Sequence, residues 1–217
     1  ASTEVNNIDT WYSWDITPLA QHWVTIPMYN YGLLLYARGN HVEYRFWSAN
    51  YGTPSRRPKL LIELEAAPVP TATPTSSPTP TATATPITPG APTSTPTPTP
   101  TPDSQVVTFQ EGINGYTGVT DTYIDGWNVD RNRGSDVGLV VRMGGVRKGL
   151  VRFDLSSIPT GSTVKQAMLS LYVTGRSNSA PMAMSAHQVL RPWSEGQAPW
   201  RLAATGAPGG QAGSTDT

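Results

Sequence analysis

The sequence predicts an all-β protein, a jelly-roll β-sandwich that is assembled from two half-domains, with one short helix and a long extended linker. Three observations predict this fold. Short runs of alternating apolar and polar residues recur in residues 1–66 and in residues 104–217. Turn-forming Gly, Pro, Asn and Ser separate these runs. Residues 67–103 between the two segments are dominated by Pro and Thr, a composition that does not form a packed core.

The first segment, residues 1–66, contains four candidate strands, at 10–17, 32–38, 42–48 and 58–64. The alternation is regular in "VEYRFWS", where Val42, Tyr44 and Phe46 are expected on one face and Trp47 on the other. "TPLAQHWV" places apolar residues at helical spacing after Thr17 and Pro18, so we expect one short helix with Thr17 as its cap.

The second segment, residues 104–217, offers six candidate strands, near 105–109, 121–125, 137–143, 148–154, 163–174 and 182–190. In "KGLVRFDL", Leu150 and Phe153 fall on different faces, which predicts a bulge or a strand buried on both sides. Strands of this length and spacing are typical of a sandwich or jelly roll.

Neither segment is expected to fold well alone. Four strands from residues 1–66 would leave one apolar face bare and the sheet edges unpaired. Together the two segments supply about 180 residues, enough to bury roughly 70% of their surface in one core. We therefore expect each segment to be half of a sandwich.

The linker, residues 67–103, holds 12 of the chain's 21 prolines, and only Asp103 in it is charged. Proline favours polyproline II geometry, which gives the linker a reach of roughly 115 Å when fully extended. Alternating Thr and Pro is also typical of O-glycosylated stalks, although an unmodified spacer has the same composition. The candidate glycosylation sites are Thr71, Thr73, Thr75, Thr79, Thr81, Thr83, Thr85, Thr93, Thr95, Thr97, Thr99 and Thr101.

Several motifs together resemble the DNRLRE-type domain, an extracellular β jelly roll related to carbohydrate-binding modules. In the second segment these are "DTYIDG" (121–126), "NRGSD" (132–136), "GLVRFDLSSIPTGSTV" (149–164), "AMLSLYV" (167–173) and "RPWSEGQAPW" (191–200). In the first segment they are the stretch from Trp11 to Trp23, "YNYGLLL" (29–35), "YRFWSANYG" (44–52) and "RRPKLLIEL" (56–64). The resemblance implies an extracellular jelly roll whose C-terminal half precedes its N-terminal half.

This permuted order favours a repeat unit that is completed by its neighbour. We expect an extracellular structural filament in which each bead joins half-domains of consecutive chains or repeats, because head-to-tail pairing does not close. A circularly permuted monomer closed by its own linker and an excerpt of a larger multi-modular protein are the alternatives. The residues expected at the seam are Trp11, Trp14, Ile16, Leu150, Phe153, Leu169 and Leu171.

Composition excludes several other classes. Fifteen basic residues balance 15 acidic ones, so charge indicates no nucleic-acid partner. No apolar run reaches the roughly 20 residues of a membrane span, and without cysteine there are neither disulfides nor thiolate metal sites. The three histidines show no catalytic spacing and no hydrolase motif is present, so we expect no enzyme and no required cofactor.

One loop carries a candidate metal site. "DGWNVDRNRGSD" spaces Asp130, Asn132 and Asp136 loosely as calcium loops space their oxygen ligands, with Asp121 and Asp125 as further candidates. The alternative is a turn in which Asn and Asp bind backbone groups.

The seven tryptophans and nine tyrosines are the last candidates. Sugar-binding modules stack glycans on exposed aromatic rings, and Trp47, Tyr51, Trp127 and Trp200 are candidates for this role. These rings would otherwise pack in the core or grip the linker or a neighbouring bead. The alternative to a filament is thus a carbohydrate-binding or adhesin module of a secreted multi-domain protein.

Overall fold

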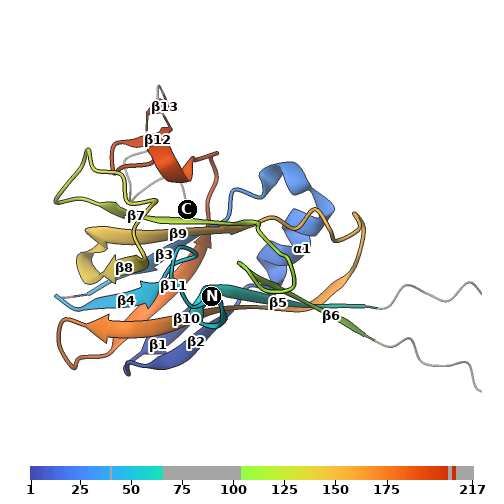
Figure 1. Cartoon of the computed structure of the whole chain (residues 1–217), viewed down its shortest axis with the longest axis horizontal. Coiled ribbons are helices and arrows are strands. Elements are labelled where there is room, and N and C mark those ends of the chain that lie inside the picture. The colour runs from blue at the N-terminus through green and yellow to red at the C-terminus, as the bar shows by residue number, and fades with distance from the viewer. Residues whose placement is uncertain (40, 66–103, 205–206, 209–217) are drawn as a thin grey trace, which may run out of the picture.

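The computed structural model describes residues 1–39, 41–65, 104–204 and 207–208 (Figure 1). The first segment forms β1 (Ser2–Val5), β2 (Thr10–Asp15), α1 (Thr17–Thr25), β3 (Leu33–Ala37), β4 (Glu43–Trp47) and β5 (Lys59–Leu64), with short 3-10 turns at Pro27–Tyr29 and Pro54–Arg56. The second segment forms β6 (Gln105–Gln110), β7 (Val119–Asp125), β8 (Gly138–Arg142), β9 (Arg147–Phe153), β10 (Val164–Arg176), β11 (Met182–Gln188), β12 (Leu202–Ala204) and β13 (Ala207–Pro208), with 3-10 turns at Met143–Gly145 and Glu195–Gln197. The predicted all-β fold with one short helix is confirmed.

The large sheet has 11 strands and is antiparallel throughout, and it curls into two layers (Figure 1). One layer runs β7, β9, β3, β11 and β1, and the other contains β8, β4, β10, β5 and β6, with β2 on the free side of β10. The layers join where Arg142 of β8 pairs with Arg147 of β9. At the opposite edge the Thr3 hydroxyl donates to the Ser13 carbonyl oxygen at 2.7 Å, which ties β1 to β2.

The main core lies between the layers, because alternate residues of each strand point inward. β3 and β5 show this pattern directly, with every second side chain buried. Trp14 is fully buried and its indole Nε1 donates to the Met184 carbonyl oxygen at 2.8 Å, so this side chain bridges the two layers. The largest apolar side chains of this core include Trp14, Tyr44, Phe46, Phe109, Leu60, Leu139 and Leu169.

A second, smaller apolar cluster covers the outer face of β7 and β9. Ile124, Leu150, Trp193 and Ala198 form it, while Phe153 points into the main core. β9 is therefore buried on both sides, which is one of the two outcomes that the spacing of Leu150 and Phe153 predicted.

The two segments are interleaved strand by strand. Every pairing made by a strand of residues 1–65 is with a strand of residues 104–204. β5 and β6 pair along their whole length, so Leu64 lies opposite Gln105, at the two ends of the linker. The segments thus share one sheet and one main core in this chain.

Three local predictions are corrected. The sequence did not predict β1, because only one of its residues, Val5, is buried and the strand therefore shows no apolar alternation. The strand predicted at 10–17 ends at Asp15, since α1 begins at Thr17. Thr17 does not cap the helix with its own side chain: the Asp15 carboxylate accepts from both the backbone N–H and the hydroxyl of Thr17, at 2.9 and 2.5 Å.

Candidate functional site

Trp127 is the most exposed tryptophan of the described residues, with 58% of its surface accessible. It lies in the turn that follows β7, where the Asp125 carboxylate accepts a hydrogen bond from its backbone N–H at 3.1 Å. Aromatic residues, Trp and Tyr above all, are enriched at binding surfaces and among the residues that dominate binding energy. Trp127 therefore marks the most promising surface for a ligand.

Two arginines lie against this ring. The guanidinium carbons of Arg142 and Arg147 are 4.8 and 4.9 Å from the centroid of the Trp127 ring. Arg142 ends β8 and Arg147 begins β9, so the tight β8–β9 connection sets them opposite each other. Cation–π attraction at this distance favours a fixed position for both guanidinium groups.

A carboxylate from the first segment holds both arginines in place. Glu43 of β4 is 4% exposed, and its Oε2 is 2.7 Å from Arg147 Nη1 and 3.8 Å from Arg142 Nη1. Its Oε1 is 3.1 Å from Nε of Arg45, whose side chain is largely exposed. Charge-assisted pairs of this kind restrict the guanidinium groups before any ligand arrives.

Asp125 is a second carboxylate that binds Arg147. Its carboxylate is buried and lies 2.9 Å from Arg133 Nη2 and 3.3 Å from Arg147 Nε. Burial alone would raise the pKa of Asp125, but hydrogen bonds from Arg147, Asn128 and the Trp127 N–H hold it below its ordinary value. Asp125 is therefore ionised at neutral pH and fixes the turn that carries Trp127.

A hollow of about 490 Å³ adjoins these residues. The Tyr123 hydroxyl donates to Asp136 Oδ2 at 3.2 Å beside it, and the Arg133 guanidinium lies over the Tyr123 ring. The hollow is lined by Arg45, Tyr123, Ser135, Asp136, Val137, Gly138, Val140 and Arg147. We call Trp127, its arginines Arg142 and Arg147, the carboxylates Glu43 and Asp125, and this hollow the Trp127 surface.

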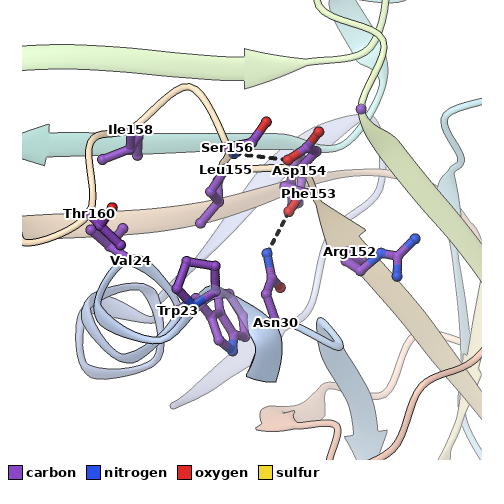
Figure 2. A pocket seen from close by; sticks show the side chains of 12 residues that line it. Trp23, Val24, Asn30, Arg152, Phe153, Asp154, Leu155, Ser156, Ile158 and Thr160 are labelled. Carbon is purple, nitrogen blue, oxygen red and sulfur yellow. Dashed lines mark hydrogen bonds between the residues drawn. The ribbon is translucent and has the colours of Figure 1, made fainter.

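A second hollow, of about 430 Å³, lies between α1 and the end of β9 (Figure 2). Figure 2 shows the Asn30 side chain directed toward Phe153, whose carbonyl oxygen accepts from Asn30 Nδ2 at 2.8 Å. The lining residues are Trp23, Val24, Pro27, Asn30, Gly118, Arg152, Phe153, Asp154, Leu155, Ser156, Ile158 and Thr160. We call this the helix pocket.

The five candidate calcium ligands lie in different surroundings. Asp125 binds arginines, as described above. Asp121 is 1% exposed, and its Oδ2 accepts from the Ala49 N–H at 2.7 Å. Asp130 is largely exposed and lies 3.7 Å from Arg201 Nη1.

The other two candidates bind protein groups. Asn132 Oδ1 accepts from the Gly134 N–H at 3.0 Å, and its Nδ2 donates to the Glu195 carbonyl oxygen at 2.6 Å. Asp136 accepts from Tyr123 and lies 3.5 Å from Arg133. Within the described ranges, no three Asp, Glu or His side chains gather as a metal site would need. Calcium binding stays a prediction.

The other aromatic candidates are engaged with protein groups. Trp47 and Tyr51 stack on each other with ring centroids 3.6 Å apart. The Trp200 ring lies 5.5 Å from the ammonium nitrogen of Lys148. Of the four proposed stacking rings, Trp127 offers the largest free surface.

Apart from Ile16, which lies between β2 and α1, the seam residues lie in strands that connect the two segments within this chain. Trp14 pairs with Leu169, and Trp11 with Tyr172, where β2 meets β10. Ile16, Phe153, Leu169 and Leu171 are buried in the main core. All twelve threonines proposed to carry sugars, from Thr71 to Thr101, lie outside the described residues.

Sequence reasoning missed Arg142, Arg147 and Glu43 as part of the site. The signal was present in "VVRMGGVRKG", where two arginines flank a glycine turn and so face each other across a hairpin. Nothing in the sequence indicated that Glu43 would lie between them, because β4 reaches this hairpin only through tertiary pairing.

The fold and this surface define a class: an all-β sandwich-like protein that presents an exposed tryptophan beside ordered charged groups. Within this class, residues 113–209 match the family model of carbohydrate-binding module family 96. The match covers the turn with Trp127 and both arginines, and leaves residues 1–65 outside. No curated protein and no solved structure matches the chain.

The matched family is one of carbohydrate-binding modules. The broader part of the resemblance, an all-β relative of carbohydrate-binding modules, is thus supported. None of the helices in the described part of the chain is long and apolar enough to span a membrane.

Proposed function

We propose that this protein is a non-catalytic glycan-binding module and that the Trp127 surface holds the glycan. The observation that carries this proposal is the exposed Trp127 ring beside Arg142 and Arg147, inside the region that matches a carbohydrate-binding family. The alternative that the sequence left open, a carbohydrate-binding or adhesin module of a secreted protein, is thereby preferred over the filament.

The chemistry of the surface suits a sugar. One face of a pyranose ring is mainly C–H and packs well against an aromatic ring, while its hydroxyls need both donors and acceptors. Arg45, Arg142 and Arg147 supply donors, and the partly exposed carboxylate of Asp136 supplies an acceptor. Because ion pairs already restrict most of these groups, binding orders few side chains.

The test is glycan binding by the Trp127→Ala variant. Loss of the stacking ring is expected to weaken binding to a soluble polysaccharide at least tenfold, because aromatic anchors dominate such contacts. Affinity electrophoresis against a panel of plant, algal and bacterial polysaccharides would first find the ligand and then compare variants. Val106→Ala removes an exposed apolar side chain on β6 and is the matched control.

The expected result is weaker retardation of the Trp127→Ala variant and unchanged retardation of the control. The proposal fails if no polysaccharide in the panel retards the unaltered chain, or if Trp127→Ala binds as tightly as the unaltered chain.

A second function is favoured by one specific observation. Because the strands of residues 1–65 pair only with strands of residues 104–204, the same pairings satisfy both segments when they come from two different chains. We propose on this basis that copies exchange half-domains head to tail in an extracellular filament, with O-linked sugars on the linker threonines from Thr71 to Thr101. Its experiment is argued at the end of the Discussion.

A further inference from the structure

We propose that the helix pocket is a second carbohydrate site, which binds a single sugar residue, such as the end of a glycan chain. This inference rests on the proposed glycan-binding function for the class of ligand, and on the pocket itself for the location. The pocket is at a different place on the sandwich from the Trp127 surface, and the two lining sets share no residue.

Buried apolar side chains form part of the pocket wall. Trp23 of α1 is 2% exposed, and Val24, Phe153, Leu155 and Ile158 are also buried. The volume of about 430 Å³ lies in the range of small-molecule sites, which typically combine such walls with a few polar groups. A sugar residue fits this pattern because its C–H faces are apolar.

Polar groups stand at the mouth of the pocket. Figure 2 shows Asp154 and Ser156 on one side, and the Asp154 carboxylate accepts from the Ser156 N–H at 2.9 Å. Arg152 also belongs to the lining, but Figure 2 shows its side chain directed away from Trp23 and Asn30, and its guanidinium lies 3.2 Å from the Thr120 hydroxyl. An exposed carboxylate that keeps a free oxygen can accept hydrogen bonds from neighbouring sugar hydroxyls.

Two buried polar atoms of the lining residues lack a hydrogen-bond partner. Trp23 Nε1 is a donor and Asn30 Oδ1 is an acceptor, and neither has a hydrogen bond, although both belong to lining residues. Leaving such atoms buried and unpaired costs free energy. Sugar hydroxyls could pair with both atoms, since a hydroxyl can accept a hydrogen bond from an N–H and can donate one to a carbonyl oxygen. Because both atoms are covered, a small side-chain movement must accompany binding.

Other ligand chemistries fit less well. An inorganic anion would meet Asp154 at the mouth and apolar walls inside. A purely apolar molecule would leave Trp23 Nε1 and Asn30 Oδ1 unpaired. A compound that carries hydroxyls on an apolar ring frame satisfies both parts of the pocket.

The experiment follows the Trp23 indole N–H and the Asn30 backbone and side-chain amides by ¹H–¹⁵N NMR in the full chain. The probes are methyl glycosides of glucose, galactose, mannose, xylose and N-acetylglucosamine, each at millimolar concentration. At least one probe is expected to shift these resonances in a saturable manner.

Thr160→Trp places a large ring at the exposed rim and is expected to weaken this binding at least tenfold. Ser157→Trp is the matched control, because Ser157 is exposed in the same loop but does not line the pocket. The control should bind the probe as the unaltered chain does. The proposal is overturned if no probe shifts the Trp23 and Asn30 resonances, or if the shifts persist unchanged in Thr160→Trp.

The two glycan proposals fail separately. Trp127→Ala should leave the Trp23 and Asn30 shifts intact, and Thr160→Trp should leave polysaccharide binding at the Trp127 surface intact. If polysaccharides do not bind but a glycoside still shifts the Trp23 resonance, then the proposal for the Trp127 surface is wrong and the proposal for the helix pocket is supported. The reverse outcome removes only the helix pocket.

Discussion

Single residues of this protein show how burial sets chemistry. Asp121 lies at the contact between the segments, where only Oδ2 has a hydrogen-bond partner and Oδ1 is buried without one. Burial, and to a smaller extent the charges of Glu195 and Glu111, raise the pKa of Asp121 to about 7. The Ala49 N–H and Arg57 act in the opposite direction but are outweighed.

This raised pKa makes stability depend on pH. Between about pH 4 and pH 7 the folded state binds a proton that the unfolded state has released, so stability is lost as the pH rises through the folded pKa. A shift of this size corresponds to at most about 4 kcal/mol. Burial also raises the pKa of Glu195, which adds to the same trend.

We therefore expect Asp121→Asn to flatten the fall in free energy of unfolding between about pH 4 and pH 7. An amide does not titrate, and its oxygen can still accept from Ala49. Urea unfolding at a series of pH values measures the slope. Asp130→Asn, at a largely exposed position, should keep the slope of the unaltered chain. An equal slope in Asp121→Asn would show that Asp121 is ionised throughout.

The binding residues were only partly predictable from the sequence. Trp127 could be named because aromatic side chains in Gly- and Asn-rich turns are often exposed. Arg142 and Arg147 could have been added from the hairpin between them. Glu43 could not have been predicted, because an acidic residue on a strand is expected to face solvent unless the partner strand is known. In the structure it is buried against arginines.

At the scale of elements, the alternation of apolar and polar residues predicted the strands that have a buried face, but it did not predict the edge strand β1. β5 and β10 were found because their inward positions are apolar. β1 was missed because it lies at the end of the sheet order and pairs with β11 alone, so its sequence needs only one buried side chain. Edge strands of this kind carry little pattern to read.

The start of β3 gives a prediction at this scale. Gly32 has φ of 83°, and a Cβ there would collide with the Val151 carbonyl oxygen and lie 2.7 Å from Arg152 Cβ. Gly32→Ala combines a left-handed backbone with this clash, so we expect a loss of at least about 2 kcal/mol of stability. Gly52→Ala meets no atom within 4 Å and is the control.

Thermal unfolding followed by circular dichroism measures both variants. Gly32→Ala should melt several degrees lower than the unaltered chain, and Gly52→Ala should stay close to it. If both variants melt together with the unaltered chain, β3 and β9 do not approach as closely as the structure has them.

At the scale of the whole molecule, the two segments depend on each other. The sequence indicated this dependence, because too few strands lay in either segment to cover an apolar face. It could not indicate which strand pairs with which, since alternation fixes the buried face of a strand but not its neighbour. The long β10 illustrates the point: β5 and β4 pair with different parts of it, and β2 pairs with it as well.

The same interleaving leads to the prediction that separates a closed monomer from a filament. In a closed chain, β5 and β6 of one molecule pair and the linker joins their ends. In a filament, residues 1–65 of one chain complete residues 104–204 of another, at almost no cost in pairing or core contacts. The balance then depends on concentration, because closure is intramolecular and exchange is not.

We expect the purified chain to form species that increase in mass by one chain of 23.3 kDa as its concentration is raised. Light scattering coupled to size exclusion measures the masses, and electron microscopy shows whether the largest species are threads. In such threads only the linkers connect neighbouring beads, so cleaving the linkers should release single beads. A closed monomer would keep its mass after cleavage, because its two segments stay paired with each other. A single monomer mass at every concentration, and an unchanged mass after cleavage, would exclude the filament and leave the glycan-binding module as a closed unit.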